Sequence, residues 1–179
     1  MNKKLLVALG IAALAVAPAL PAAAASNTGS FGVSVIAATQ ATITVTGTTV
    51  TCTTGTGVTV IACTGTIQAA GNMRSTKSGT STLTLTAPGA TIPGSTSSIP
   101  VSALQMTCSD NGSTGTFGTA TYASAAPSST TAVSCASWAT TAANVFSYNV
   151  NLNFGIDQSK VPADTYATQT GWTITASAT

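Results

Sequence analysis

The stretch FSYNVNLNFGID, residues 146–157, decides the fold class because its apolar residues fall on every second position. Successive side chains of a β-strand point to opposite faces, so this alternation predicts a strand with one apolar and one polar face. The apolar row consists of Tyr148, Val150, Leu152, Phe154 and Ile156. The opposite row consists of three amides, Asn149, Asn151 and Asn153. This row is either a plain solvated face or a hydrogen-bonding face for glycan or a neighbouring subunit. Asparagine is not a favoured strand residue, so three on one face are unusual.

The same alternation recurs along the chain between segments rich in Gly, Pro, Asn and Ser. It is seen in residues 31–35, 42–46, 82–86 and 171–175. Turn-forming residues gather in residues 53–57, 87–100, 109–116 and 124–131. Many short alternating runs with regular breaks predict an all-β protein, a single antiparallel β-sandwich of seven to ten strands resembling immunoglobulin-like or pilin-like domains.

The N-terminus has the layout of a secretory signal peptide. Lys3 and Lys4 precede an apolar run over residues 5–20, and small residues stand at Ala23 and Ala25. We expect cleavage after Ala25, which leaves residues 26–179 as one β-sandwich domain. The alternative is a retained membrane anchor. The signal predicts a secreted, cell-surface protein without membrane insertion after cleavage.

Charge limits the choice of partners. Without the two leader lysines the charged side chains are three cations and three carboxylates, so they sum to zero. They are Arg74, Lys77, Lys160, Asp110, Asp157 and Asp164. Nucleic acid is therefore not an expected partner, because no basic patch exists to displace counterions from phosphates. The same argument applies to anionic lipid surfaces.

The composition argues against enzymatic chemistry. The chain has no His, and its acidic residues are three scattered Asp, so neither a Ser/His/Asp set nor paired glutamates can form. No cofactor is predicted, and no catalytic or metal-ligating residues are assigned. A weak ion held by Asp157 and Asp164 is the alternative.

Four cysteines in an exported chain predict two disulfides. Neighbours along the chain are the favoured pairs, namely Cys52–Cys63 and Cys108–Cys135. Loops of these lengths contribute roughly 3 and 3.5 kcal/mol in the chain-entropy model. The alternative is a metal site built from all four thiolates.

The aromatic residues divide into expected core positions and one candidate contact. Tyr148, Phe154 and Trp172 lie in alternating runs and are expected in the core. Trp138, close after Cys135, is expected to pack on the disulfide or a loop. The alternative is an exposed Trp138 that stacks on sugar beside the Asn row, as in a carbohydrate-binding module.

The last part of the chain, residues 148–179, resembles the closing hairpin of secreted bacterial surface β-sandwiches. The spacing of Tyr166, Trp172 and Ile174 is similar to the C-terminal motif of WxL-type cell-wall-binding domains, with Ile174 in place of Leu. Residues 97–109 resemble a segment common in such proteins. The resemblance implies an extracellular β-rich domain that attaches noncovalently to peptidoglycan. The upstream Trp-x-Leu partner of that family is missing here.

A second resemblance is to pilins and spore-coat-like subunits that polymerise by donating a strand. The segment PADTY, residues 162–166, is similar to their endings. Phe31, Val33 and Val35 would suit the donated strand, and pairing within the same chain is the alternative. Together these patterns predict a non-enzymatic structural protein of the bacterial cell surface or envelope. It would associate noncovalently with the cell wall or with neighbouring surface components, and a self-assembling subunit or a glycan-binding module is the alternative.

Overall fold

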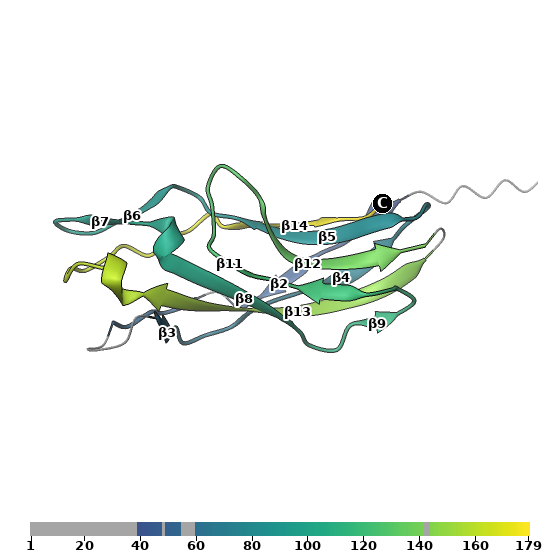
Figure 1. The fold of residues 1–179 in the computed structure, drawn as a ribbon, viewed down its shortest axis with the longest axis horizontal. Coiled ribbons are helices and arrows are strands. Elements are labelled where there is room, and N and C mark those ends of the chain that lie inside the picture. Colours follow the sequence, from purple (N-terminus) through teal and green to yellow (C-terminus); the bar gives the residue numbers. More distant parts are fainter. Residues whose placement is uncertain (1–38, 48, 55–59, 142–143) are drawn as a thin grey trace, which may run out of the picture. The chain divides into compact units, whose positions relative to one another are not determined.

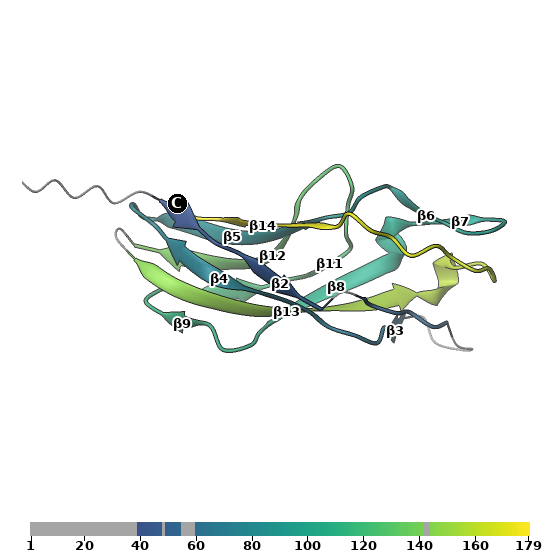
Figure 2. The same ribbon diagram turned by 180° about the vertical axis from the view of Figure 1, so that it is seen from behind.

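The computed structural model of the chain describes residues 39–47, 49–54, 60–141 and 144–179, all within one compact unit. The predicted signal peptide, residues 1–25, lies outside them, as do the candidate donor residues Phe31, Val33 and Val35. The described part consists of antiparallel β-sheets (Figures 1 and 2). The predicted all-β class is therefore confirmed.

The larger sheet is built around one long central strand, β13 (Val145–Asp157). Its main path has the order β1 (Gln40–Ala41), β4 (Ile67–Arg74), β13, β8 (Leu104–Asp110) and β11 (Ser124–Ala125). Three short strands pair beside this path: β2 (Thr44–Thr46) with β4, and β3 (Val60–Ala62) and β9 (Thr114–Gly115) with β13. The alternating stretch that predicts a strand therefore forms the middle of the sheet.

The smaller sheet has four strands. Their order is β10 (Ala120–Tyr122), β12 (Val133–Thr140), β5 (Gly79–Thr86) and β14 (Thr173–Ser177). A separate hairpin is formed by β6 (Thr91–Pro93) and β7 (Ser98–Pro100). The helices of the described residues are single 3-10 turns, η1 (Val101–Ala103) and η2 (Gln158–Lys160), so none there is long enough to cross a membrane.

The number of strands differs from the seven to ten that the sequence predicts, because the described residues form fourteen strand segments. Several segments are fragments of one longer path. The registers Ala41 with Met73 and Thr44 with Ala70 continue without a shift, so β1 and β2 together follow one edge of β4. Sequence alternation does not mark such interruptions.

The main hydrophobic cluster draws side chains from both sheets. Figures 1 and 2 show β14, β5 and β12 in one layer and β4, β13 and β8 in the other. Leu83 and Leu85 of β5 and Val150 and Leu152 of β13 are fully buried in this cluster. The burial of leucine and valine side chains contributes about 1.5–3 kcal/mol each, so this shared cluster is the main stabilising element.

Trp138 lies at the centre of this cluster and is 0% exposed. Its ring centroid is 5.5 Å from those of Phe146 and Tyr148 and 6.4 Å from that of Tyr122. The alternative of an exposed, sugar-stacking Trp138 is therefore wrong. The physical reason is that β12 turns Trp138 to the inner face, where aromatic side chains of the larger sheet enclose it.

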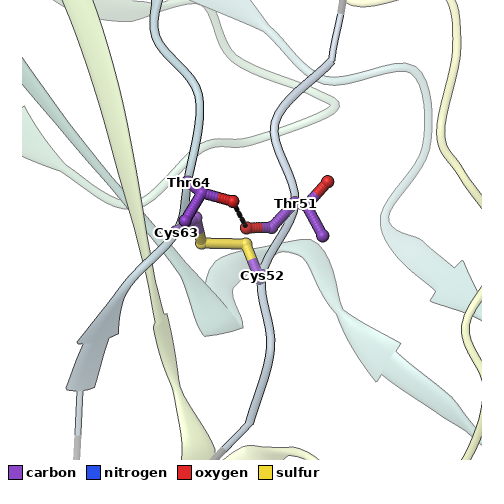
Figure 3. The surroundings of a disulfide bond; sticks show 4 residues. All are labelled: Thr51, Cys52, Cys63 and Thr64. Carbon is purple, nitrogen blue, oxygen red and sulfur yellow. Dashed lines mark hydrogen bonds between the residues drawn. A yellow bond between two sulfur atoms is a disulfide. The ribbon is translucent and has the colours of Figure 1, made fainter.

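Both predicted disulfides are confirmed. Cys108–Cys135 joins β8 of the larger sheet to β12 of the smaller sheet inside the main cluster. Cys52–Cys63 closes a loop beside two backbone hydrogen bonds between Thr51 and Thr64. Figure 3 shows the disulfide and a third hydrogen bond there, which the Thr64 hydroxyl donates to the carbonyl of Thr51. Both cysteines of this disulfide are half-buried against a second cluster. The buried members of that cluster are Ala87, Ile92, Ile99, Val101, Leu104 and Ile156.

Candidate functional site

The three asparagines of β13 lie on the face of the larger sheet that points away from the core. Asn149 and Asn151 are half-buried and Asn153 is exposed, whereas the alternate residues Tyr148, Val150 and Leu152 are buried. The cause is the pleat of the strand, which sends neighbouring side chains to opposite faces. Because β13 is the central strand, the asparagines are flanked by strands on both sides.

The flanking strands extend this polar row sideways. Asn151 pairs with Gln68 of β4 and Ser109 of β8, and Asn153 pairs with Thr107 of β8. We define the amide face by the five outward amide residues in the middle of these strands and by Thr107 beside them. They are Gln68, Asn72, Thr107, Asn149, Asn151 and Asn153.

Hydrogen bonds across the strands hold several of these amides in place. The hydroxyl of Ser147 donates to Oδ1 of Asn72 at 2.6 Å. The hydroxyl of Thr66 donates to Oδ1 of Asn153 at 2.9 Å. Fixed side chains lose less conformational entropy when they bind a ligand, so the face is partly preorganised.

A shallow, open depression of about 410 Å³ lies at one end of the amide face. Asn72, Ser147 and Asn149 line it, together with the small residues Ala70 and Gly112. Ala70 pairs directly with Asn149, so its short side chain leaves a hollow between longer polar neighbours. The lining offers amide and hydroxyl groups and no charged group.

The three carboxylates lie elsewhere and bind neighbouring groups of the chain. The hydroxyl of Ser113, followed by its backbone N–H, lowers the pKa of Asp110, and Tyr122 also donates to this carboxylate. The hydroxyl of Ser159 lowers the pKa of Asp157, which also pairs with Lys160 at 3.3 Å. These hydrogen bonds favour the ionised forms of Asp110 and Asp157. Both carboxylates therefore stabilise local structure.

Asp164 binds the tip of the β6–β7 hairpin. Its carboxylate accepts hydrogen bonds from the Ser95 hydroxyl and from the backbone N–H groups of Thr96 and Ser97, the latter two at 2.9 and 2.8 Å. The pKa of Asp164 is therefore strongly lowered. Asp157 and Asp164 each bind neighbouring groups of the fold. In the part of the chain that the structure describes, no three His, Cys, Asp or Glu residues lie close enough together to hold a metal ion.

The residues of the WxL-like motif are half-buried and do not form an exposed row. Tyr166 donates to the carbonyl of Pro162 at 2.7 Å and lies 3.2 Å from the Ser97 hydroxyl. Trp172 packs edge-on against Phe154, with centroids 6.0 Å apart. Ile174 pairs with Leu85 and packs on the main cluster. These side chains stabilise the C-terminal segment against the two clusters.

The sequence does not reveal that Gln68 and Asn72 belong to the amide face. Their strand, IQAAGNMR, lacks clear alternation because small Ala and Gly residues occupy both faces. Only the register with β13 places them beside the asparagines. The one signal in the sequence is the presence of two more amides in a β-prone segment.

Comparison with known protein families, with curated proteins and with solved structures found no match. The fold and the site define the chain as an antiparallel all-β protein with two disulfides and a row of uncharged polar side chains across the middle of its larger sheet.

Proposed function

We propose that the protein is a non-enzymatic structural component of the bacterial cell surface, held on the cell wall by noncovalent contact through the amide face. The observation that carries the proposal is the row of Asn149, Asn151 and Asn153 on the central strand, widened on both sides by Gln68, Asn72 and Thr107. A signal-like leader, residues 1–25, supports export.

The chemistry of the amide face suits a neutral polysaccharide. Amide groups both donate and accept hydrogen bonds, and sugar hydroxyls do the same. The six residues of the amide face carry no charge, and the charged outward residues of these strands stand at the strand ends, Arg74 on β4 and Asp157 on β13. A polar, uncharged polymer is therefore the class of ligand that it favours.

The same surface predicts weak binding of single sugars. Every aromatic side chain of the described residues is buried or half-buried, so none stands free to stack on a sugar ring. Affinity must then come from many hydrogen-bonding contacts along one polymer. Repeated contacts raise the overall affinity when each contact is weak.

The absence of catalytic residue types in the sequence supports a structural role. The chain has no His, and its three acidic residues are all Asp. Asp110, Asp157 and Asp164 each accept hydrogen bonds from nearby groups of the fold. Carboxylates with lowered pKa values are poor general bases at neutral pH.

The test is sedimentation of the purified exported protein with isolated, insoluble cell wall. A triple variant, Asn149→Ser, Asn151→Ser and Asn153→Ser, keeps the face polar but shortens its side chains. The matched control is Thr82→Ser, Thr84→Ser and Thr86→Ser, on the outer face of the other sheet's β5. We expect the asparagine variant to lose wall binding by roughly tenfold or more, as weak parallel contacts are lost together.

The control variant should bind the wall like the wild-type protein. Wild-type protein that stays in the supernatant, or an asparagine variant that binds like the wild type, would contradict the proposal. Circular dichroism and the urea midpoint of each variant show whether a loss of binding comes from unfolding.

A further inference from the structure

Asn111 is the one asparagine of this sequence that is followed by glycine. In an Asn-Gly pair no side chain shields the asparagine amide from the backbone nitrogen of the next residue. The other asparagines that the structure describes precede larger residues, such as Val150, Leu152 and Phe154. The sequence therefore singles out the pair of Asn111 and Gly112 as the place where a side-chain amide and a backbone nitrogen can react.

The structure places this pair in an open turn. Asn111 and Gly112 directly follow β8, and both are exposed to solvent. Gly112 has a φ of 96°, in the left-handed region, and a Cβ added there would meet no atom within 4 Å. Because glycine is free to change its backbone angles and the surrounding space is empty, the two reacting groups can approach each other without a clash.

Both reacting groups are weakly held. Nδ2 of Asn111 donates to Oδ1 of Asn149 at 3.4 Å, which is longer than the usual range for such hydrogen bonds. The pKa of Asp110 is lowered most by the hydroxyl and the N–H of Ser113, and the N–H of Gly112 contributes least among the donors to this carboxylate. The nitrogen of Gly112 is therefore not fixed by a strong partner.

The asparagines of the amide face are held differently. Asn149 and Asn151 lie in the central strand, and the residues that follow them, Val150 and Leu152, are buried and pair with β4. Neighbouring residues of a strand point to opposite faces, and the ladder engages their backbone N–H groups. The amides of the face are therefore protected from the reaction that the turn permits.

We propose that Asn111 deamidates spontaneously in the folded protein and becomes a mixture of aspartate and isoaspartate. The nitrogen of Gly112 attacks Cγ of Asn111, the new N–Cγ bond closes a succinimide ring, and the Cγ–Nδ2 bond breaks. The side-chain nitrogen leaves as ammonia, with the proton that the Gly112 nitrogen gives up. Water then opens the ring at Cγ to give aspartate, or at the main-chain carbonyl carbon to give isoaspartate. The net reaction consumes water and releases ammonia.

The product changes the rim of the amide face. A second carboxylate then stands next to Asp110 and beside the depression that Gly112 and Asn149 line. The side chain of residue 111 can no longer donate to Oδ1 of Asn149. This modification goes beyond the proposed wall binding and does not depend on it, so the two proposals can fail separately.

Isoaspartate also lengthens the backbone of the turn by an extra carbon atom. The added atom lies between two contacts with Asn149. The N–H of Asn111 donates to the carbonyl of Asn149 at 2.8 Å, and the N–H of Asn149 donates to the Ser113 hydroxyl at 3.0 Å. We therefore expect faster hydrogen exchange at the N–H of Asn149 in the isoaspartate form.

The test incubates the purified protein, with both disulfides formed, for days in mildly alkaline buffer. Peptide mapping by mass spectrometry locates each deamidated residue, and electron-transfer fragmentation distinguishes isoaspartate from aspartate. We expect Asn111 to react roughly tenfold faster, or more, than Asn149, Asn151 and Asn153, since a barrier higher by about 1.4 kcal/mol already slows a step tenfold.

The matched control is Asn111→Gln, which keeps an amide in the turn but would have to close a larger ring. On ion exchange the wild-type protein should gain an acidic form with time, whereas this variant should stay a single species. An unchanged wild type, equal rates at Asn111 and at the asparagines of β13, or the same acidic form in the glutamine variant would overturn the proposal. Unchanged hydrogen exchange at Asn149 in the isoaspartate form would refute the effect on the amide face.

Discussion

At the scale of single residues, Asp164 ties the C-terminal segment to the β6–β7 hairpin. Three consecutive residues, Ser95, Thr96 and Ser97, donate hydrogen bonds to its carboxylate. An isolated antiparallel bridge between Gly94 and Tyr166 strengthens the same contact. The charge of Asp164 thus stabilises a contact between segments about seventy residues apart in the sequence.

This contact predicts how stability depends on pH. The pKa of Asp164 is strongly lowered in the folded protein, first by the Ser95 hydroxyl and then by the N–H of Thr96. A group with a lowered folded pKa stabilises the fold above its unfolded pKa, about 3.9, and this contribution is lost as the pH falls toward the folded value. Asp164→Asn should therefore lower the urea midpoint at neutral pH, and the difference from the wild type should shrink at about pH 3. A variant as stable as the wild type at neutral pH would contradict this role.

Gly71 is a second residue with a steric reason for its identity. A Cβ there would collide with the carbonyl oxygen of Thr42 and would lie 2.8 Å from Oη of Tyr148. The Tyr148 hydroxyl donates to the same carbonyl at 2.7 Å, and burial raises the pKa of Tyr148 to about 12, so it stays a donor. Gly71→Ala should destabilise the protein by about 1–3 kcal/mol, as overpacking does.

The control for this substitution is Gly89→Ala. A Cβ at Gly89 would meet only the carbonyl oxygen of Thr91, at 3.6 Å, which is an ordinary contact. Chemical denaturation should therefore find this variant close to the wild type. Equal losses of stability at Gly71 and Gly89 would show that the close approach at Gly71 is not the cause.

At the scale of elements, the sequence predicts strands best where both faces are chemically distinct. In β13 and β5 the burial follows the sequence alternation closely, because buried residues alternate with more exposed polar residues along both strands. The hairpin β6–β7 lies in a segment that the sequence marks as a loop, since Gly and Pro surround its two short strands. Local composition does not report that Ile92 and Ile99 pair across it and anchor the second cluster.

The candidate site was predictable only in part for the same reason. The row of Asn149, Asn151 and Asn153 is visible in one strand, because it depends only on the period of two. The contributions of Gln68 and Thr107 depend on register between strands far apart in the sequence. Trp138 belongs to the same cluster as Cys108 and Cys135, but its central position depends on β12 facing the larger sheet, which its closeness to Cys135 in the sequence does not reveal.

The two disulfides differ in the elements that they connect, and this predicts the order of their reduction. Cys108 and Cys135 are 5% and 0% exposed between the sheets, whereas Cys52 and Cys63 are half-buried beside a loop. Thiol–disulfide exchange requires access of the attacking thiolate. Mild reductant should therefore open Cys52–Cys63 first, as mass spectrometry after alkylation would detect.

Removal of each bond tests its contribution to stability. Cys52→Ala with Cys63→Ala should cost roughly 3 kcal/mol in the chain-entropy model. Cys108→Ala with Cys135→Ala should cost roughly 3.5 kcal/mol, and the buried sulfur contacts add to this. Reduction of the Cys108–Cys135 bond first, or a smaller loss of stability when it is removed, would contradict its position between the sheets.

At the scale of the whole molecule, the chain is notable for how few charges it carries. Charged residues make up 4% of the sequence, and after the leader the chain contains three cationic side chains and three carboxylates. Repulsion between copies is then weak, which favours association through uncharged surfaces. The proposed wall contact is of this kind, since the amide face holds amides and a hydroxyl.

Binding to the cell wall should therefore be insensitive to salt. Screening weakens interactions between exposed charges beyond about 8–10 Å at moderate ionic strength, but it does not act on hydrogen bonds between neutral groups or on apolar burial. Wall binding, measured between about 50 mM and about 500 mM sodium chloride, should change by less than about threefold. A loss of tenfold or more across the chloride series would mean that ion pairs hold the protein on the wall. The contact would then have to involve Arg74, Lys77, Lys160 or the aspartates, none of which belongs to the amide face.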